Sequence, residues 1–214
     1  MNSHRRNHFA LFATILLIAS VGLVACSGDE PASPTTPAGA GNAAASITDD
    51  PSYQAILQLE GGAELLESIP ELQDKSWCPP GARLFLAYYN TTIEVVPPFP
   101  PPTLNVNIWY DGIGTMLGRH TGYGASTVDV TVIPNVQLAA PTMTGANGDE
   151  LDFDAVGIAV EGEGEGDVDF EGSFDITGGT GRFAGATGSG HYRGSANTIE
   201  QAGRVVYWGY IVLQ

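Results

Sequence analysis

From about residue 81 to the C-terminus, hydrophobic and polar positions alternate with a period of two in short runs. Over residues 104–110, leucine, valine, isoleucine and tyrosine occupy every second position, with asparagine or tryptophan between them. Alternation of this kind, rich in β-branched and aromatic residues, is typical of β-strands. Strands are predicted at 84–89, 104–110, 116–124, 127–133, 151–160, 168–177, 183–193 and 205–213.

The connections between these runs carry the residues that tight turns require. Asn147-Gly148 supplies residues that tolerate positive φ between two strand-like segments. Gly112 and Gly122 stand near or inside predicted strands, where glycine usually marks sharp bending or the close approach of a neighbour. Short strands at regular spacing therefore predict an all-β fold, a single antiparallel eight-stranded β-barrel over residues 81–214.

Residues 51–80 have a different pattern. Isoleucine and leucine recur at roughly helical spacing over residues 53–74, but Gly61-Gly62 and Pro70 interrupt the repeat. The segment is therefore predicted to be a partly helical lead-in to the barrel.

The first 25 residues have the order of a secretory signal peptide. Arg5 and Arg6 precede an apolar run, 9–23, that is shorter than the roughly 20 residues a membrane span needs. The run ends in the tetrapeptide Leu-Val-Ala-Cys at 23–26, which resembles the lipobox of bacterial lipoproteins. That resemblance implies cleavage before Cys26, attachment of lipid to its thiol, and a place in the cell envelope, on the outer membrane where there are two membranes. The alternative is a plain signal peptide, or an uncleaved anchor, with an incidental cysteine.

Residues 26–50 are mostly Ser, Pro, Ala, Thr, Gly and acidic residues, with almost no bulky apolar side chain. A segment of this composition does not bury enough surface to offset the entropy of ordering the chain. It is predicted to be a flexible linker between the lipid-anchored end and the folded domain.

The chain is strongly acidic, with 24 Asp and Glu against 8 Lys and Arg. Loss of Arg5 and Arg6 with the signal peptide leaves 6 basic against 24 acidic residues, a formal charge of −18. Nucleic acid is excluded as a partner, because that affinity rests on Lys and Arg displacing counterions from phosphates. The membrane is expected as a partner through the lipid anchor alone, since polybasic attraction to anionic headgroups is missing. Nothing in the composition selects an oligomeric state.

Three blocks of sequence resemble a known family. They are residues 112–122 (GIGTMLGRHTG), 146–150 (ANGDE) and 176–190 (ITGGTGRFAGATGSG). They are similar to bacterial exported proteins of the allene oxide cyclase barrel-like group, which is distantly related to plant dirigent proteins. The resemblance covers roughly half of the domain and implies an eight-stranded antiparallel barrel with a central, largely apolar cavity. It also implies an alternative function, a cyclase-like or dirigent-like enzyme acting on a hydrophobic substrate in that cavity.

No G-x-S-x-G, H-E-x-x-H, C-x-x-C or Walker motif is present, so no catalytic residue is assigned. Polar groups in an apolar pocket orient the polar head of a ligand. Inward-facing basic residues would have this role, whereas outward-facing ones would only offset the acidic surface. The candidate ligand-binding residues are Arg119, His120, His191 and Arg193.

Residues 161–171 carry six carboxylates at alternate positions. In a strand they would share one face, where their repulsion must be screened, paired or relieved by a cation. Oxygen-rich clusters favour calcium over softer metals. A solvated outer face or a hairpin rim is the alternative interpretation. The candidate calcium ligands are Glu161, Glu163, Glu165, Asp167 and Asp169.

The sequence is compatible with three functions. The favoured one is an exported, lipid-anchored β-barrel that binds a small hydrophobic ligand without catalysis. The second is the cyclase-like or dirigent-like enzyme, and the third is a calcium-binding structural surface module with its barrel filled by side chains. A hollow interior separates the first two from the third, because small eight-stranded barrels are either filled or hold one ligand.

Overall fold

The computed structural model describes residues 48, 50–59, 61–73, 78–96 and 102–214, which all belong to one unit, Asn42–Gln214. The predicted signal peptide, Cys26 and nearly all of the linker lie outside the described residues. Two short helices and then a 3-10 turn precede the strands. No helix in the described ranges is long and apolar enough to cross a membrane. These elements are α1 (Pro51–Leu57), α2 (Gly62–Glu67) and η2 (Pro70–Gln73).

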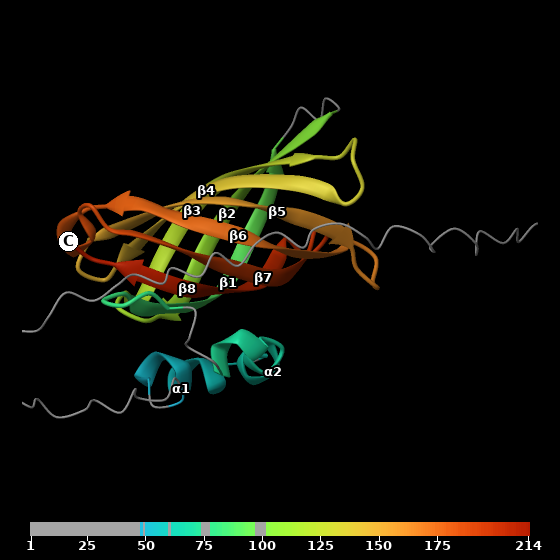
Figure 1. Ribbon diagram of the computed structural model, residues 1–214. Helices are drawn as coiled ribbons and strands as arrows, with labels where there is room; N and C mark the ends of the chain where they lie inside the picture. Colours follow the sequence, from blue (N-terminus) through green and yellow to red (C-terminus); the bar gives the residue numbers. More distant parts are fainter. Residues whose placement is uncertain (1–47, 49, 60, 74–77, 97–101) are drawn as a thin grey trace, which may run out of the picture. The chain divides into compact units, whose positions relative to one another are not determined.

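Eight antiparallel strands form a closed barrel in which β1 pairs with β8 and every other strand pairs with its neighbours in the sequence (Figure 1). The predicted fold is therefore confirmed. In β6 the even-numbered positions face the interior and the odd-numbered positions face solvent. The strands are β1 (Arg83–Val96), β2 (Thr103–Gly114), β3 (Gly118–Asp129), β4 (Asn135–Gly145), β5 (Glu150–Glu161), β6 (Asp167–Gly179), β7 (Thr187–Asn197) and β8 (Ala202–Val212).

The predicted strand boundaries are wrong at the third and fourth strands of the barrel. One strand, β3, replaces the two strands predicted at 116–124 and 127–133, and the prediction missed β4 altogether. In β4 the larger aliphatic residues, Val136 and Leu138, face outward and are exposed. Pro141 lies in mid-strand, and the pairing of β4 with β5 skips it because proline has no N–H to donate. The strand was missed because its larger hydrophobic residues face outward and because it contains a proline.

Aromatic rings fill one end of the barrel interior. Phe85 on β1, Phe153 on β5 and Phe174 on β6 are almost fully buried, with ring centroids 5.5 to 5.8 Å apart. Gly190 and Gly209 lie between Phe174 and Phe85 in the strand register, and a Cβ at Gly190 would approach the Phe174 ring to 2.7 Å. These in-strand glycines are therefore sites of close approach between neighbours.

The connections at this end complete the packed core. Leu117 from the β2–β3 turn and Phe183 and Ala186 from the β6–β7 connection are buried in the same cluster as the aromatic rings. Phe183 lies in a 3-10 turn, η4 (Gly181–Phe183), where the sequence had predicted the start of a strand. The Asn147-Gly148 turn between β4 and β5 is as expected, with Gly148 at φ +84°.

The lead-in packs against the outer side of β1 and β8. Its leucine and isoleucine side chains form a second hydrophobic cluster with the outward-facing residues of these two strands. Both faces of β1 are therefore buried over 84–89, which explains the continuous hydrophobic run there. The buried members of the cluster are Ile56, Leu66, Ile69, Leu72, Leu86, Tyr88, Val206 and Trp208.

Candidate functional site

The half of the barrel interior away from the aromatic core is hollow. It holds a cavity of about 180 Å³ to which all eight strands contribute. Val130 and Thr198, from the β3–β4 and β7–β8 connections, also border it, so the cavity lies at the end of the barrel opposite the packed core. Its aliphatic and phenyl wall consists of Ile93, Val95, Leu104, Val106, Ile108, Val128, Ala139, Ala155, Ala159, Val168, Phe170, Ala196 and Val205.

A change in side-chain size along the strands leaves this space. On β5 the inward positions run from Leu151 and Phe153 in the packed end to Ala155 and Ala159 in the hollow end. Ala139 on β4 faces the same space. Alanine keeps the alternation of the strand but does not reach the barrel axis, so the interior is filled at one end only.

Three tyrosines form the floor between the cavity and the packed core. Tyr110, Tyr192 and Tyr207 line the cavity, and the rings of Tyr192 and Tyr207 stack with centroids 5.4 Å apart. A side-chain hydrogen bond joins Tyr110 and Tyr207. Burial raises the pKa of Tyr110 and of Tyr192 to about 12, and it raises the pKa of Tyr207 well above its ordinary value. All three hydroxyls therefore stay protonated at neutral pH and act as neutral hydrogen-bonding groups.

His120 is the one predicted ligand-binding residue that faces the interior. It is 3% exposed, its Nδ1 lies 2.7 Å from the Gly118 carbonyl oxygen, and its Nε2 lies 2.8 Å from the Tyr89 hydroxyl. A carbonyl only accepts, so Nδ1–H donates to it and Nε2 accepts from Tyr89. Burial lowers the pKa of His120, and the ring is neutral. Gly112 lies between Tyr89 and His120 in the register and leaves room for this contact.

Arg119 and His191 lie on the outside of the barrel. Arg119 is paired with Asp111, with Nη2 3.7 Å from Oδ2, and both side chains are largely exposed. The His191 ring lies 5.8 Å from that of Trp208 on the neighbouring strand. Neither residue lines the cavity, and His120 sits below its floor, so the residues predicted to orient a ligand do not border the hollow interior.

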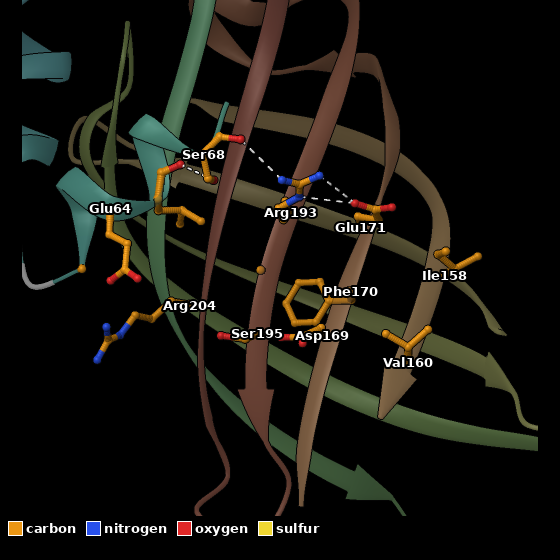
Figure 2. Close-up of a pocket in the computed structure, with 13 residues that line it drawn as sticks. Glu64, Ser68, Ile158, Val160, Asp169, Phe170, Glu171, Arg193, Ser195 and Arg204 are labelled. Carbon is orange, nitrogen blue, oxygen red and sulfur yellow. Dashed lines mark hydrogen bonds and ion pairs between the residues drawn. The ribbon is translucent and has the colours of Figure 1, made fainter. Parts of the chain in front are cut away.

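Arg193, the fourth predicted residue, borders a groove on the outside of the barrel. The groove has a volume of about 610 Å³ and is lined by residues of α2 and of β5 to β8. Figure 2 shows the Arg193 guanidinium between Glu171, at 3.0 Å, and the carbonyl oxygen of Ser68, at 3.4 Å. Ile158 and Val160 form the apolar side of the groove and are exposed. Because Arg193 is already paired and the groove faces solvent, the interior cavity is the stronger candidate for ligand binding.

The acidic run forms the rim of a hairpin. Glu161 ends β5, Asp167 begins β6, and Glu163 and Glu165 lie in the connection between them. The Asp167 carboxylate accepts hydrogen bonds from a backbone N–H of the turn at 3.0 Å and from Asn197 Nδ2 at 2.7 Å. This carboxylate therefore has a structural role in closing the turn.

Asp169, the last candidate calcium ligand, follows on the outer face of β6. In the described part of the chain, no group of three or more His, Cys, Asp or Glu side chains is arranged to hold a metal ion. Calcium binding stays a prediction from the sequence.

The sequence matches no protein-family model and no curated protein. The function must therefore be argued from the site itself.

The tyrosine floor was not among the functional residues predicted from the sequence. The sequence gives only a weak signal for it. The inward-facing residues of β7 are small except for Tyr192, which lies between Gly190 and Gly194. The cavity and floor together provide an apolar space with neutral hydrogen-bonding groups at its base. This arrangement suits binding of an uncharged hydrophobic molecule.

Proposed function

We propose that this protein is an exported, lipid-anchored β-barrel that binds a small hydrophobic molecule inside the barrel without catalysis. The observation that carries the proposal is the interior cavity, whose wall is made mostly of aliphatic side chains. An apolar molecule that leaves water for such a wall gains about 25 cal/mol for each Å² of its surface that is buried.

The size of the cavity defines the size of the ligand. An engineered apolar cavity of about 150 Å³ in another protein stays dry and binds benzene. The cavity here, at about 180 Å³, therefore suits a molecule of about one ring with a short substituent. A long acyl chain would extend out of the barrel.

The lipid anchor is supported by the Leu-Val-Ala-Cys tetrapeptide at residues 23–26 and by the linker that follows it. The anchor would hold the barrel at the membrane, where apolar molecules concentrate. Replacement of Cys26 by serine should release the protein into the soluble fraction. Membrane association of Cys26→Ser unchanged from wild type would contradict lipidation at this residue.

Ligand binding is tested with ethylbenzene as the probe and residues 27–214 without lipid, which contain the whole unit Asn42–Gln214. Ala139 and Ala140 offer a matched pair on β4, since Ala139 lines the cavity and Ala140 is exposed on the outer face. Ala139→Leu places a larger side chain in the cavity and should weaken binding about tenfold or more, whereas Ala140→Leu should bind as wild type. Binding is measured by calorimetry and by chemical-shift changes in the NMR spectrum.

Two results would contradict the proposed function. One is wild-type protein that binds no ethylbenzene. The other is equal weakening in both leucine variants, because binding would then not depend on the interior of the barrel.

A further inference from the structure

Tyr192 extends across the inside of the barrel wall. It projects inward from β7, and the residues beside it in the register on β6 and β5 are both glycines, Gly172 and Gly157. A Cβ at Gly172 would lie 2.8 Å from the Tyr192 hydroxyl oxygen, and one at Gly157 would lie closer still. The two glycines therefore give the phenol ring space to lie flat against the wall, with its hydroxyl group well away from its own strand.

The other buried tyrosine hydroxyls nearby have partners. Tyr89 donates to His120, and Tyr110 and Tyr207 are joined by a hydrogen bond. Within the part of the chain that the structure describes, the Tyr192 hydroxyl makes no hydrogen bond, although the residue is only 4% exposed. Among the described residues, the fully buried side-chain polar atom without a partner is Trp208 Nε1 and not the Tyr192 hydroxyl oxygen, which therefore borders open space and is available to donate. A ligand with an acceptor atom would satisfy this group.

The charge of the wall restricts the ligand further. Among the described residues that line the cavity, none is Asp, Glu, Lys, Arg or His. A carboxylate or ammonium group would be desolvated here without a counter-ion, which is strongly unfavourable. Gln137, a polar residue in the wall, already donates from Nε2 to Ser126 Oγ at 3.0 Å. An uncharged acceptor is the chemistry that remains.

We propose that the cavity selects uncharged molecules of about one ring that carry an acceptor oxygen, as in a ketone or an ether, and that the Tyr192 hydroxyl donates a hydrogen bond to this oxygen. This inference rests on the proposed function, because it concerns the ligand of the same cavity. Tyr192 is then the residue that determines specificity, while the aliphatic wall supplies most of the affinity.

The test compares three probes that share a phenyl ring. Ethylbenzene has a methylene group where acetophenone has a carbonyl group, and benzoate has a charged carboxylate. Each is titrated against wild type, Tyr192→Phe and the matched control Tyr123→Phe, whose ring is exposed on the outer face of β3. The measured quantity is the ratio of the acetophenone and ethylbenzene affinities, because comparing this ratio between proteins cancels the different hydration of the probes.

In Tyr192→Phe we expect acetophenone to bind about tenfold more weakly and ethylbenzene to bind within about twofold of wild type. Tyr123→Phe should leave both affinities unchanged, and benzoate should not bind to any of the three proteins. A wild-type ratio retained in Tyr192→Phe would overturn the inference, since another group such as Thr91, which also lines the cavity, would then donate to the ligand.

A second measurement needs no variant. The infrared stretch of carbonyl-labelled acetophenone should shift to lower frequency than in an apolar solvent when the carbonyl accepts a hydrogen bond from wild-type protein. An unshifted stretch in the bound state, or binding of benzoate, also overturns the inference. Binding of ethylbenzene alone would reject the role of Tyr192 and leave the proposed function standing, whereas the absence of binding by every probe would reject the proposed function itself.

Discussion

Mild acid should destabilise this protein through His120. In the fold the ring is buried, accepts a hydrogen bond from Tyr89, and has a pKa below its ordinary value of 6.5 because burial disfavours the charged form. The unfolded chain exposes the same ring to water, so it takes up a proton near pH 6.5. Stability that is present above this pH is therefore lost as the pH falls below it, since the unfolded state then binds more protons than the folded state.

The size of the effect follows from one proton. The free energy of unfolding contributed by one group changes by at most about 1.4 kcal/mol per pH unit. At pH 5.5, one unit below the unfolded pKa, a ring that stays neutral in the fold loses about 1.4 kcal/mol. The backbone contact of His120 with Gly118 and the charge of Asp111 both raise the pKa of His120 and bring the loss below this limit.

Urea unfolding between pH 8 and pH 5.5 measures this loss. The useful quantity is the difference in pH dependence between wild type and His120→Gln, because every other ionisable group is the same in the two proteins. His191→Gln is the matched control, because His191 is exposed on the outside of the barrel. The reasoning is refuted if His120→Gln retains the wild-type pH dependence, or if wild type is the less sensitive of the two to acid.

Two other predictions concern packing and charge. Gly190→Ala should lower the free energy of unfolding by about 1–3 kcal/mol, because its Cβ would meet the Trp208 carbonyl oxygen and the Phe174 ring. Urea unfolding measures this loss. The control is the outward-facing Ser189→Ala, whose free energy of unfolding should lie within about 0.5 kcal/mol of wild type. Glu171→Gln removes the exposed ion pair with Arg193 and should change the free energy of unfolding by less than about 0.5 kcal/mol. The affinity for ethylbenzene should stay the same. A loss of ethylbenzene binding would place the ligand in the outer groove instead.

The closed barrel was predictable because each inward side chain alternates with one that faces solvent in most strands. The prediction failed at β4, where Val136 and Leu138 face outward and Gln137 faces inward. In this strand, burial of polar atoms depends on partners from another strand, since Gln137 donates to Ser126 on β3. A pattern within one strand does not contain that partner.

The candidate site was less predictable than the fold. Arg119 and His120 are neighbours in the sequence, yet one is exposed beside Asp111 and the other is buried against Tyr89. Which of two adjacent residues faces inward depends on the register of the whole strand, and a shift by one position exchanges them. The sequence named both as candidates for this reason.

The amino-acid sequence alone predicts an acidic antiparallel barrel of eight strands that comes after a partly helical lead-in. This is possible because hydrophobic alternation and turn residues act over a few neighbouring positions. Only the tertiary structure decided that the barrel is packed at one end and hollow at the other. That outcome depends on which side chains meet across the barrel axis: rings such as Phe85 and Phe174 meet over glycines in one half, while alanines leave space in the other. The meeting of side chains from strands far apart in the sequence is set by the closure of β1 on β8, which no local pattern records.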